Sequence, residues 1–295
     1  MNVLVIGATG YIGTAVDEAL TRHGHCVVAT ARSEAAAARL QARGTASVDA
    51  DVAKPQTLVA PIRAADAVVY CVAITDADPW SVDHKALKQI AKALAGSEKT
   101  FVYVSAAWIY GYTGSEPVDE AAPLHAPPFV ARRIELERTS LDMTRIGVRA
   151  LNVRPGIVYG RGGGVPSMFV QSARERGAAT ILGDGDNHWA TIDVADLGEL
   201  IALAVERGRP GRAYNAVNDD WFKMREIAEA ASRGAGAGGA LAIVPETMMG
   251  QYGECLRLDQ RLSAARAKTD LDWSAKRPSI VEDLERGSYQ EAALA

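Results

Sequence analysis

The first half of the chain alternates short apolar runs with longer segments in which apolar residues recur every three or four positions. This alternation is typical of a parallel sheet that carries helices on both faces. The runs expected to form strands are Val3–Gly7, Cys26–Thr30, Ala46–Asp49, Ala67–Val72, Thr100–Ser105 and Val148–Arg154. The segments expected to form helices are Gly13–Arg22, Ala35–Ala42, Gln56–Arg63, Asp83–Leu94 and Arg133–Thr144. The sequence therefore predicts the α/β class with a doubly wound parallel sheet.

After Arg154-Pro155-Gly156 the pattern loosens, and glycine-rich segments interrupt the regular periodicity. The expected loops are Gly160–Gly164, Gly183–Asp186 and Arg233–Gly239, and the expected later elements are a helix over Asp193–Glu206 and strands over Ala213–Val217 and Leu241–Val244. We expect residues 1–158 to form the large domain, with residues 190–218 returning to its sheet. Residues 159–189 and 219–295 are expected to form a smaller C-terminal α/β lobe.

Composition narrows the class of protein. With 48% hydrophobic residues among 295, the chain can bury a substantial core, so intrinsic disorder is excluded. The 32 Lys and Arg residues against 36 Asp and Glu give a net charge of -4. Since no segment gathers charge of one sign, neither nucleic acid nor an anionic membrane is an expected partner.

The sequence shows neither a targeting signal nor a metal-binding motif. No apolar run reaches the roughly 18 to 20 residues of a membrane-spanning helix, and the N-terminus lacks the basic region of a signal peptide. We therefore expect a cytoplasmic protein. Cys26, Cys71 and Cys255 are odd in number and widely spaced, which fits neither a disulfide framework nor a zinc site. No metal cofactor is expected.

The strongest local motif lies between the first expected strand and the first expected helix, where glycines recur every three residues from Gly7 to Gly13. The first glycine allows a tight turn, the second lets the backbone approach a pyrophosphate, and the third lets the helix pack against the strand. Amide groups at the helix N-terminus then attract phosphate. This motif predicts a Rossmann-type dinucleotide site. The expected contacts are Gly7, Thr9, Gly10, Tyr11, Ile12 and Gly13.

The end of the second expected strand indicates which dinucleotide is bound. A carboxylate about 20 residues past the glycines would bind the ribose hydroxyls of NAD. The chain has Arg32-Ser33 there instead, and a guanidinium suits the 2′-phosphate of NADP(H). The alternative is that Arg32 is a solvated loop residue. Further expected cofactor contacts, which could equally be ordinary strand-end residues, are Asp51, Val52, Val72 and Ala73.

With these residues in place, the chain resembles the extended and atypical short-chain dehydrogenase/reductase superfamily, which includes NAD-dependent epimerases and dehydratases. The markers are Gly7–Gly13, Asp51, Val102–Ser105 leading to Tyr110-Gly111, the helix bearing Glu137, Arg154–Gly160, Asp193–Asp196 and Leu271-Asp272-Trp273. They cover nearly the whole chain. The resemblance implies a cofactor bound at the carboxyl edge of the sheet, with the smaller lobe closing over it to bind substrate.

The resemblance also implies a Tyr-x-x-x-Lys pair and a serine, in which the tyrosine moves a proton. Phe129 and Arg133 stand at the positions of the pair, and Ala106 stands at the serine position. A shift of one residue would instead place Ser105 there. Phenylalanine has no proton to donate and arginine cannot act as a base, so the usual proton donor is missing.

Three outcomes are open. The protein is an oxidoreductase whose substrate accepts hydride readily, or it recruits another acid, or it is a nucleotide-bound sensor or scaffold without hydride chemistry. The candidate acids are Tyr110, Tyr159, His188 and His125, and each has a structural alternative as a packing, anchoring or solvated residue. Arg133 is expected to bind the nicotinamide ribose, with a surface ion pair to Glu137 as its alternative.

The remaining expectations follow from the resemblance. The chain segment after the sixth strand is expected to contact the cofactor through Pro155, Gly156 and Val158. The expected substrate contacts are Ala106, Trp108, Phe129, Tyr159 and Trp189, with Trp80 also near the cleft. Their aromatic character favours a small apolar or aromatic substrate over a nucleotide sugar, although Arg161 and Arg174 could contribute to a diphosphate site. A homodimer through the helices over Asp83–Leu94 and Arg133–Thr144 is also implied.

Overall fold

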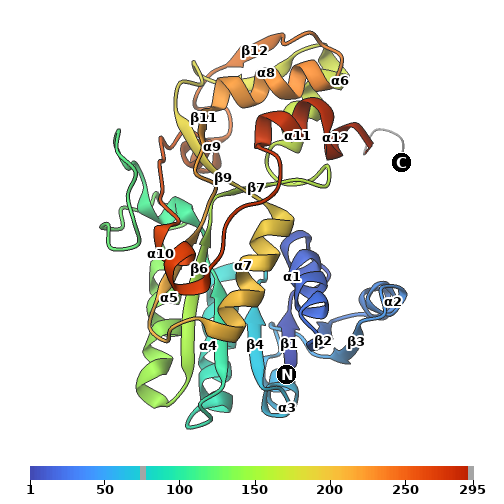
Figure 1. Cartoon of the computed structure of the whole chain (residues 1–295), viewed down its shortest axis with the longest axis vertical. Coiled ribbons are helices and arrows are strands. Elements are labelled where there is room, and N and C mark those ends of the chain that lie inside the picture. The colour runs from blue at the N-terminus through green and yellow to red at the C-terminus, as the bar shows by residue number, and fades with distance from the viewer. Residues whose placement is uncertain (74–77, 292–295) are drawn as a thin grey trace.

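The computed structural model describes residues 1–73 and 78–291. A seven-stranded, wholly parallel sheet forms the centre of the larger lobe (Figure 1). Its strands, in spatial order, are β10 (Ala213–Ala216), β6 (Arg149–Pro155), β5 (Thr100–Val104), β4 (Ala67–Tyr70), β1 (Asn2–Ile6), β2 (Cys26–Ala31) and β3 (Ala46–Asp49). This order reverses beside β1 and confirms the predicted doubly wound Rossmann fold.

Helices cover both faces of this sheet. One face carries α1 (Tyr11–Arg22), α2 (Glu34–Ala42), α7 (Val194–Arg207) and α10 (Ala265–Leu271). The other carries the 3-10 turn η1 (Pro55–Leu58), α3 (Val59–Ala64), α4 (Pro79–Leu94), α5 (Arg133–Asp142) and η3 (Met143–Ile146). Successive residues of β1 enter opposite cores, since Val3 and Val5 join the first and Leu4 and Ile6 the second.

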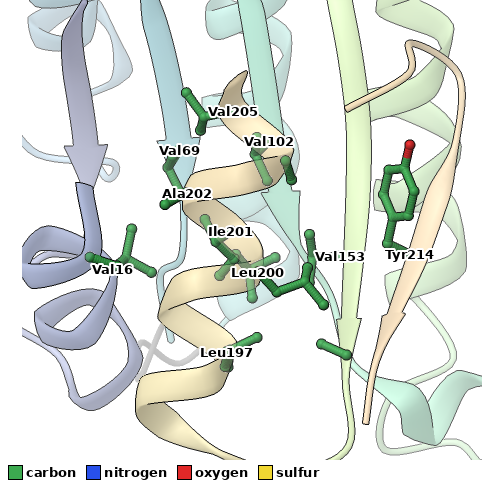
Figure 2. Close-up of a cluster of buried hydrophobic side chains, with 14 of the residues drawn as sticks. Val16, Val69, Val102, Val153, Leu197, Leu200, Ile201, Ala202, Val205 and Tyr214 are labelled. Atoms are coloured by element: carbon green, nitrogen blue, oxygen red, sulfur yellow. The ribbon is translucent and has the colours of Figure 1, made fainter. Parts of the chain in front are cut away.

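Helix α7 fills the centre of the first core. Figure 2 shows Leu197, Leu200 and Ile201 of this helix against the sheet that carries Val102 and Val153. Strand β10, which follows α7 in the sequence, pairs in parallel with β6 at the edge of the large sheet. The chain therefore leaves the larger lobe after β6 and comes back to complete it.

The smaller lobe contains two short sheets and the later helices. Strands β11 (Trp221–Lys223), β9 (His188–Asp193) and β7 (Ile157–Tyr159) form one sheet, and β12 (Leu241–Val244) pairs with β8 (Ala179–Leu182) in the other. The helices are α6 (Ser167–Arg176), α8 (Met224–Gly234), α9 (Gly250–Leu256), α11 (Ile280–Arg286) and α12 (Ser288–Glu291). Most of these elements have no counterpart among the sequence-based expectations.

The start of α4 differs from its expected position because of local capping. The helix begins at Pro79 rather than Asp83, with the Asp78 side chain accepting a hydrogen bond from the Ser81 amide at 3.2 Å. Proline is favoured in the first helical turn, where its missing N–H has no partner to lose. In residues 1–73 and 78–291, no helix combines the length and the hydrophobicity needed to cross a bilayer.

Candidate functional site

The turn between β1 and α1 requires glycine at both of its ends. Gly7 has a φ of +100°, and a Cβ there would lie 2.6 Å from the Cys71 carbonyl oxygen. A Cβ on Gly13 would lie 2.1 Å from the Gly7 carbonyl oxygen. Side chains are therefore excluded by close backbone approach at both positions. The first turn of α1 carries no acidic residue, so nothing there repels an anion.

A cavity of about 550 Å³ opens at this turn. It is lined by Ile6, Gly7, Thr9, Gly10, Tyr11, Ile12, Thr30, Arg32, Ser33, Ala36, Arg39, Ala50, Asp51, Val52, Cys71, Val72 and Ala73. Nearly every residue expected on the adenosine and pyrophosphate side of the cofactor is among them. Gly13 is instead buried beneath the turn. The backbone cradle and the cavity together fit a dinucleotide.

Two arginines line the part of the cavity beside β2 and α2. Arg32 follows β2, and Arg39 lies seven residues later, within α2. Both residues are exposed. Ser33 caps α2 by accepting a hydrogen bond from the Ala36 amide at 3.2 Å. Sequence reasoning missed Arg39, which lies within α2, whereas Arg32 lies before that helix begins.

The strand end that bears Ser105 has an unusual polar atom. The Ser105 amide donates to the Val153 carbonyl at 2.8 Å, whereas its buried hydroxyl has no partner among the described residues. Ala106 precedes η2 (Ala107–Tyr110) and contributes no polar side chain. Trp108 in η2 is half-buried and packs against the core of the smaller lobe, so it lies where the two lobes meet.

The structure corrects the role expected for Tyr110. Its side chain is 1% exposed, and its hydroxyl donates to Asn215 at 2.8 Å while accepting from Arg154 at 2.7 Å. Burial raises the pKa of Tyr110 to about 12, although the Arg154 charge opposes the shift. The hydroxyl is thus committed to a buried network, which fits an anchor for η2 rather than a proton donor to substrate.

Arg133 begins α5 and Phe129 lies in the turn before it, with very different surroundings. Phe129 is 42% exposed, a high value for a large apolar side chain. Arg133 is half-buried and donates to the Tyr103 hydroxyl at 3.4 Å. The ion pair considered between Arg133 and Glu137 is wrong, because Glu137 pairs with Arg154 at 2.6 Å. Arg133 is therefore not committed to a carboxylate on its own helix.

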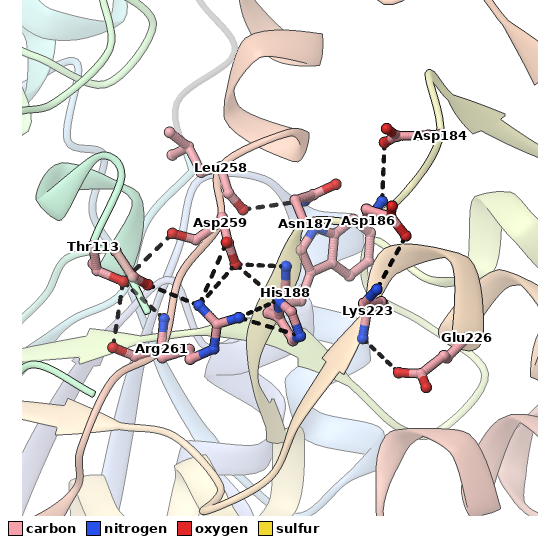
Figure 3. A network of polar contacts seen from close by, with 12 residues as sticks. Thr113, Asp184, Asp186, Asn187, His188, Lys223, Glu226, Leu258, Asp259 and Arg261 are labelled. Atoms are coloured by element: carbon pink, nitrogen blue, oxygen red, sulfur yellow. Dashed lines mark hydrogen bonds and ion pairs between the residues drawn. The ribbon is translucent and has the colours of Figure 1, made fainter. Parts of the chain in front are cut away.

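His188 belongs to a polar cluster in the smaller lobe (Figure 3). Its Nδ1 lies 3.0 Å from Asp259 Oδ1 and 2.6 Å from Arg261 Nη2. The Arg261 guanidinium also donates to the Gly114 carbonyl at 2.7 Å. The His188 side chain is 21% exposed, so a ligand can reach part of the ring. Sequence reasoning gave no indication of its two charged neighbours, which come from 71 and 73 residues away.

Two residues expected to touch substrate are instead buried structural side chains. Tyr159 is fully buried, donates to the Pro278 carbonyl at 2.6 Å and accepts from Asn218 at 2.9 Å. Trp189 is 1% exposed and donates to the Leu256 carbonyl at 2.7 Å. The Tyr159 hydroxyl and the Trp189 indole N–H both have hydrogen-bond partners in the protein, and both side chains are buried. Neither side chain therefore faces a cleft.

Other expected contacts have structural roles or lie elsewhere. A Cβ on Gly156 would lie 2.3 Å from the Ala190 carbonyl oxygen, so this glycine allows close packing of β9. Pro155 pairs with β10, and Val158 lies in β7. The residues considered for other parts of the site are placed as follows: Arg161 pairs with Glu18, Arg174 donates to the Tyr289 carbonyl, Trp80 lies in the first turn of α4, and His125 is exposed.

An aromatic cluster that the sequence did not indicate joins the two lobes. Tyr252 from α9 packs edge-on against Phe129, with ring centroids 5.6 Å apart, and edge-on against Trp108 at 5.7 Å. Phe129 and Tyr252 are 123 positions apart in the sequence, and only the placement of the smaller lobe brings them together. No group of residues suited to hold a metal ion occurs in the described part of the chain.

Comparison with known proteins shows related reductases. The chain is 29% identical over 247 residues to a 2-alkyl-3-oxoalkanoate reductase from Stenotrophomonas maltophilia, which covers 77% of this chain and 73% of the relative. It is 28% identical over 236 residues to an NAD(P)H azoreductase from Xenophilus azovorans. That match covers 79% of this chain and 74% of the relative.

The fold also matches a solved structure along its whole length. A dTDP-glucose 4,6-dehydratase from Bacillus anthracis in complex with NAD superposes with a TM-score of 0.82 at 18% identity, covering 100% of this chain and 96% of the other. The model of the NAD dependent epimerase/dehydratase family matches residues 3–217. The chain therefore belongs to the NAD dependent epimerase/dehydratase family, within the extended short-chain dehydrogenase/reductases.

Proposed function

We propose that this protein is an NADP-dependent oxidoreductase that reduces a small apolar or aromatic molecule. The observation that carries the proposal is the presence of Arg32 and Arg39 at the ribose end of the cavity, where a carboxylate would favour NAD. Two guanidinium groups can bind a 2′-phosphate by charge-assisted hydrogen bonds. A ribose that ends in two hydroxyls gives these arginines no anion to bind.

The residues of this chain have separate roles in the proposal. The glycine turn binds the pyrophosphate, and Arg133 donates to the hydroxyls of the nicotinamide ribose. Ser105 and His188 contact the reacting end of the substrate. Bound NADPH supplies the hydride. Pro155 and Val158 lie along the path that the resemblance gives to the nicotinamide and stay as predicted contacts.

The substrate class follows from the aromatic cluster and from the missing tyrosine. Trp108 and the exposed Phe129 offer apolar surface where the two lobes meet. A general acid contributes about 10²–10⁴ in rate, so its loss at position 129 favours acceptors that take hydride readily. Enones, quinones, azo compounds and iminium ions are such acceptors. The names of the two relatives support reduction of a carbonyl or azo group.

The experiment measures the affinity for NADPH and NADH by nicotinamide fluorescence, in the wild type and in Arg32→Ala and Arg39→Ala. We expect each substitution to weaken NADPH binding about 10-fold or more and to change NADH binding little, because only NADPH offers the phosphate. Arg145→Ala is the matched control, since Arg145 has an 81% exposed side chain far along the chain in η3. Binding of neither nucleotide would refute the proposal.

A nucleotide-binding sensor without hydride chemistry is the second candidate, favoured by the changes at Ala106 and Phe129. It is tested in the same preparation by adding enone, quinone, azo and iminium acceptors to protein saturated with NADPH. Oxidation of NADPH by any of them supports the reductase. Tight binding without oxidation favours the sensor. A homodimer through α4 and α5 and a location in the cytoplasm stay as predictions.

A further inference from the structure

Tyr252 differs from the other tyrosines in the state of its hydroxyl group. The chain has nine tyrosines. Seven have hydroxyls in hydrogen bonds: Tyr11 with Gly160, Tyr70 with Asp83, Tyr103 with Arg133, Tyr110 with Arg154 and Asn215, Tyr159 with Pro278, Tyr214 with Asp270, and Tyr289 with Gly163. Tyr112 is 68% exposed and faces water.

Tyr252 is half-buried, yet no hydrogen bond from its hydroxyl occurs within residues 1–73 and 78–291. Its oxygen is not among the buried side-chain atoms of the described residues that lack a partner, so the hydroxyl reaches solvent although the ring is half-buried. The hydroxyl of Tyr252 is therefore available to a ligand that enters between the lobes.

The position of Tyr252 matches the place where the proton donor is missing. Its ring contacts Phe129 edge-on at 5.6 Å with an interplanar angle of 71°. Phe129 is the residue that the sequence resemblance places at the position of the family's tyrosine. Tyr252 also contacts Trp108, two residues after Ala106. Helix α9 of the smaller lobe thus brings a tyrosine ring into contact with Phe129 and with Trp108 of the larger lobe.

We propose that Tyr252 donates the proton that Phe129 cannot supply, which makes it a catalytic residue contributed by the smaller lobe. The inference rests on the proposed reductase function. In the step, the carbon of a C=O bond, or one nitrogen of an N=N bond, gains a hydride from reduced nicotinamide, and the π electron pair of that bond moves to its other atom. That atom takes the proton of the Tyr252 hydroxyl, and the phenolate is reprotonated by water. NADPH is oxidised by two electrons and the acceptor is reduced by two.

The surroundings of Tyr252 suit an acid rather than a base. Burial raises the pKa of its hydroxyl, and the nearby Cys255 thiol raises it further. The group is therefore protonated at neutral pH. Because burial disfavours the phenolate, the phenol releases its proton only to an atom that becomes strongly basic. Reduced carbonyl oxygen and azo nitrogen are such atoms.

The test compares acceptors that need a proton with one that does not. An iminium ion takes hydride and becomes a neutral amine without protonation, whereas an enone or azo compound must be protonated. In Tyr252→Phe we expect the ratio of kcat/KM for the enone to that for the iminium ion to fall about 100-fold. Tyr112→Phe, the same chemical change at an exposed tyrosine, is expected to leave the ratio unchanged. An unchanged ratio in Tyr252→Phe would overturn the proposal.

A binding measurement separates this proposal from the reductase function itself. We would determine the affinity for 4-nitrophenolate by equilibrium dialysis in the presence of NADP⁺, because its oxyanion resembles the charge that develops on a reduced carbonyl. Loss of a hydrogen bond to an anion should raise the Kd in Tyr252→Phe about 10-fold. If the wild type fails to oxidise NADPH with any of the acceptors, the reductase function is refuted. The binding measurement still shows whether the Tyr252 hydroxyl binds an oxyanion. Equal Kd values in the two proteins would refute that role.

Discussion

Arg154 and Glu137 form a buried ion pair that holds helix α5 against strand β6. Arg154 Nε lies 3.0 Å from Glu137 Oε1 and Arg154 Nη2 lies 2.6 Å from Oε2, so the contact is bidentate. Their side chains are 7% and 3% exposed. The remaining guanidinium nitrogen donates to Tyr110, so the carboxylate and the phenol together satisfy all of the buried charge. Arg133 lies one helical turn before Glu137. The ion pair therefore also holds the first turn of α5, and with it Arg133, in place.

Removing one member of this pair should be far more harmful than removing both. Arg154→Met leaves the Glu137 carboxylate buried without a partner, and we expect the free energy of unfolding to fall by about 3–5 kcal/mol. The double variant Arg154→Met with Glu137→Met has no orphaned charge and should recover much of the loss. Urea unfolding of the two variants measures the difference. Equal destabilisation would show that the ion pair is not the source of the effect.

Between elements, a histidine joins α1 to α7. His23 follows α1, and its two ring nitrogens lie 2.9 Å from Glu206 Oε1 and 2.8 Å from Glu199 Oε1, both on α7. Burial on its own would lower the pKa of His23, but hydrogen bonds to the two glutamates outweigh burial and raise it. Protonated His23 thus binds α7 more strongly than the neutral ring does.

This contact predicts a pH dependence of stability. Since the pKa of His23 is higher in the folded than in the unfolded state, the contribution is fully present below the unfolded value of about 6.5 and is lost as pH rises through the folded value. The wild type should lose stability across that window, and His23→Gln should lose less. Thermal unfolding at several pH values measures this, with His125→Gln as the exposed control. Parallel curves for the wild type and His23→Gln would contradict the assignment.

The elements differ in how far the sequence predicts them. The turn from Gly7 to Gly13 and the strands of the large sheet were predictable because their signals are local: glycine spacing, and continuous apolar runs buried on both faces. The prediction that Tyr159 and Trp189 contact substrate was wrong. The sequence around an aromatic residue near a strand end has the same pattern whether its side chain faces a cleft or the core. Tyr252 could not be predicted, since its contact with Phe129 depends on how one lobe is placed on the other.

For the molecule as a whole, Tyr11 links the nucleotide cavity to the smaller lobe. Its ring lines the cavity, and its hydroxyl donates to the Gly160 carbonyl at 2.7 Å, in the loop that leads into the smaller lobe. A Cβ on Gly163 would lie 2.7 Å from the Tyr11 ring, so loop and ring are in close contact. We therefore expect nucleotide binding in the cavity to change the amide exchange of that loop.

Hydrogen exchange can test this link. We expect NADPH to slow amide exchange over Gly160–Gly164 in the wild type and to slow it less in Tyr11→Phe, which leaves the Gly160 carbonyl without its partner. The same substitution should lower Tm by a few degrees, because a hydrogen bond is worth about 1 kcal/mol. Tyr112→Phe serves as the control. Exchange in this loop that does not respond to NADPH in the wild type would show that the lobes are uncoupled.

The route of the chain also bears on how the protein is made. Strand β6 ends at Pro155, but its outer neighbour β10 begins only at Ala213, after the chain has passed through the smaller lobe. During synthesis on the ribosome, β6 must therefore present an unpaired edge until that later segment emerges. Exposed edges of parallel strands invite pairing with other chains, and such long-range closure is slow. Neither lobe is a continuous stretch of sequence, so a nascent chain halted before β10 has an incomplete sheet whose open edge favours aggregation.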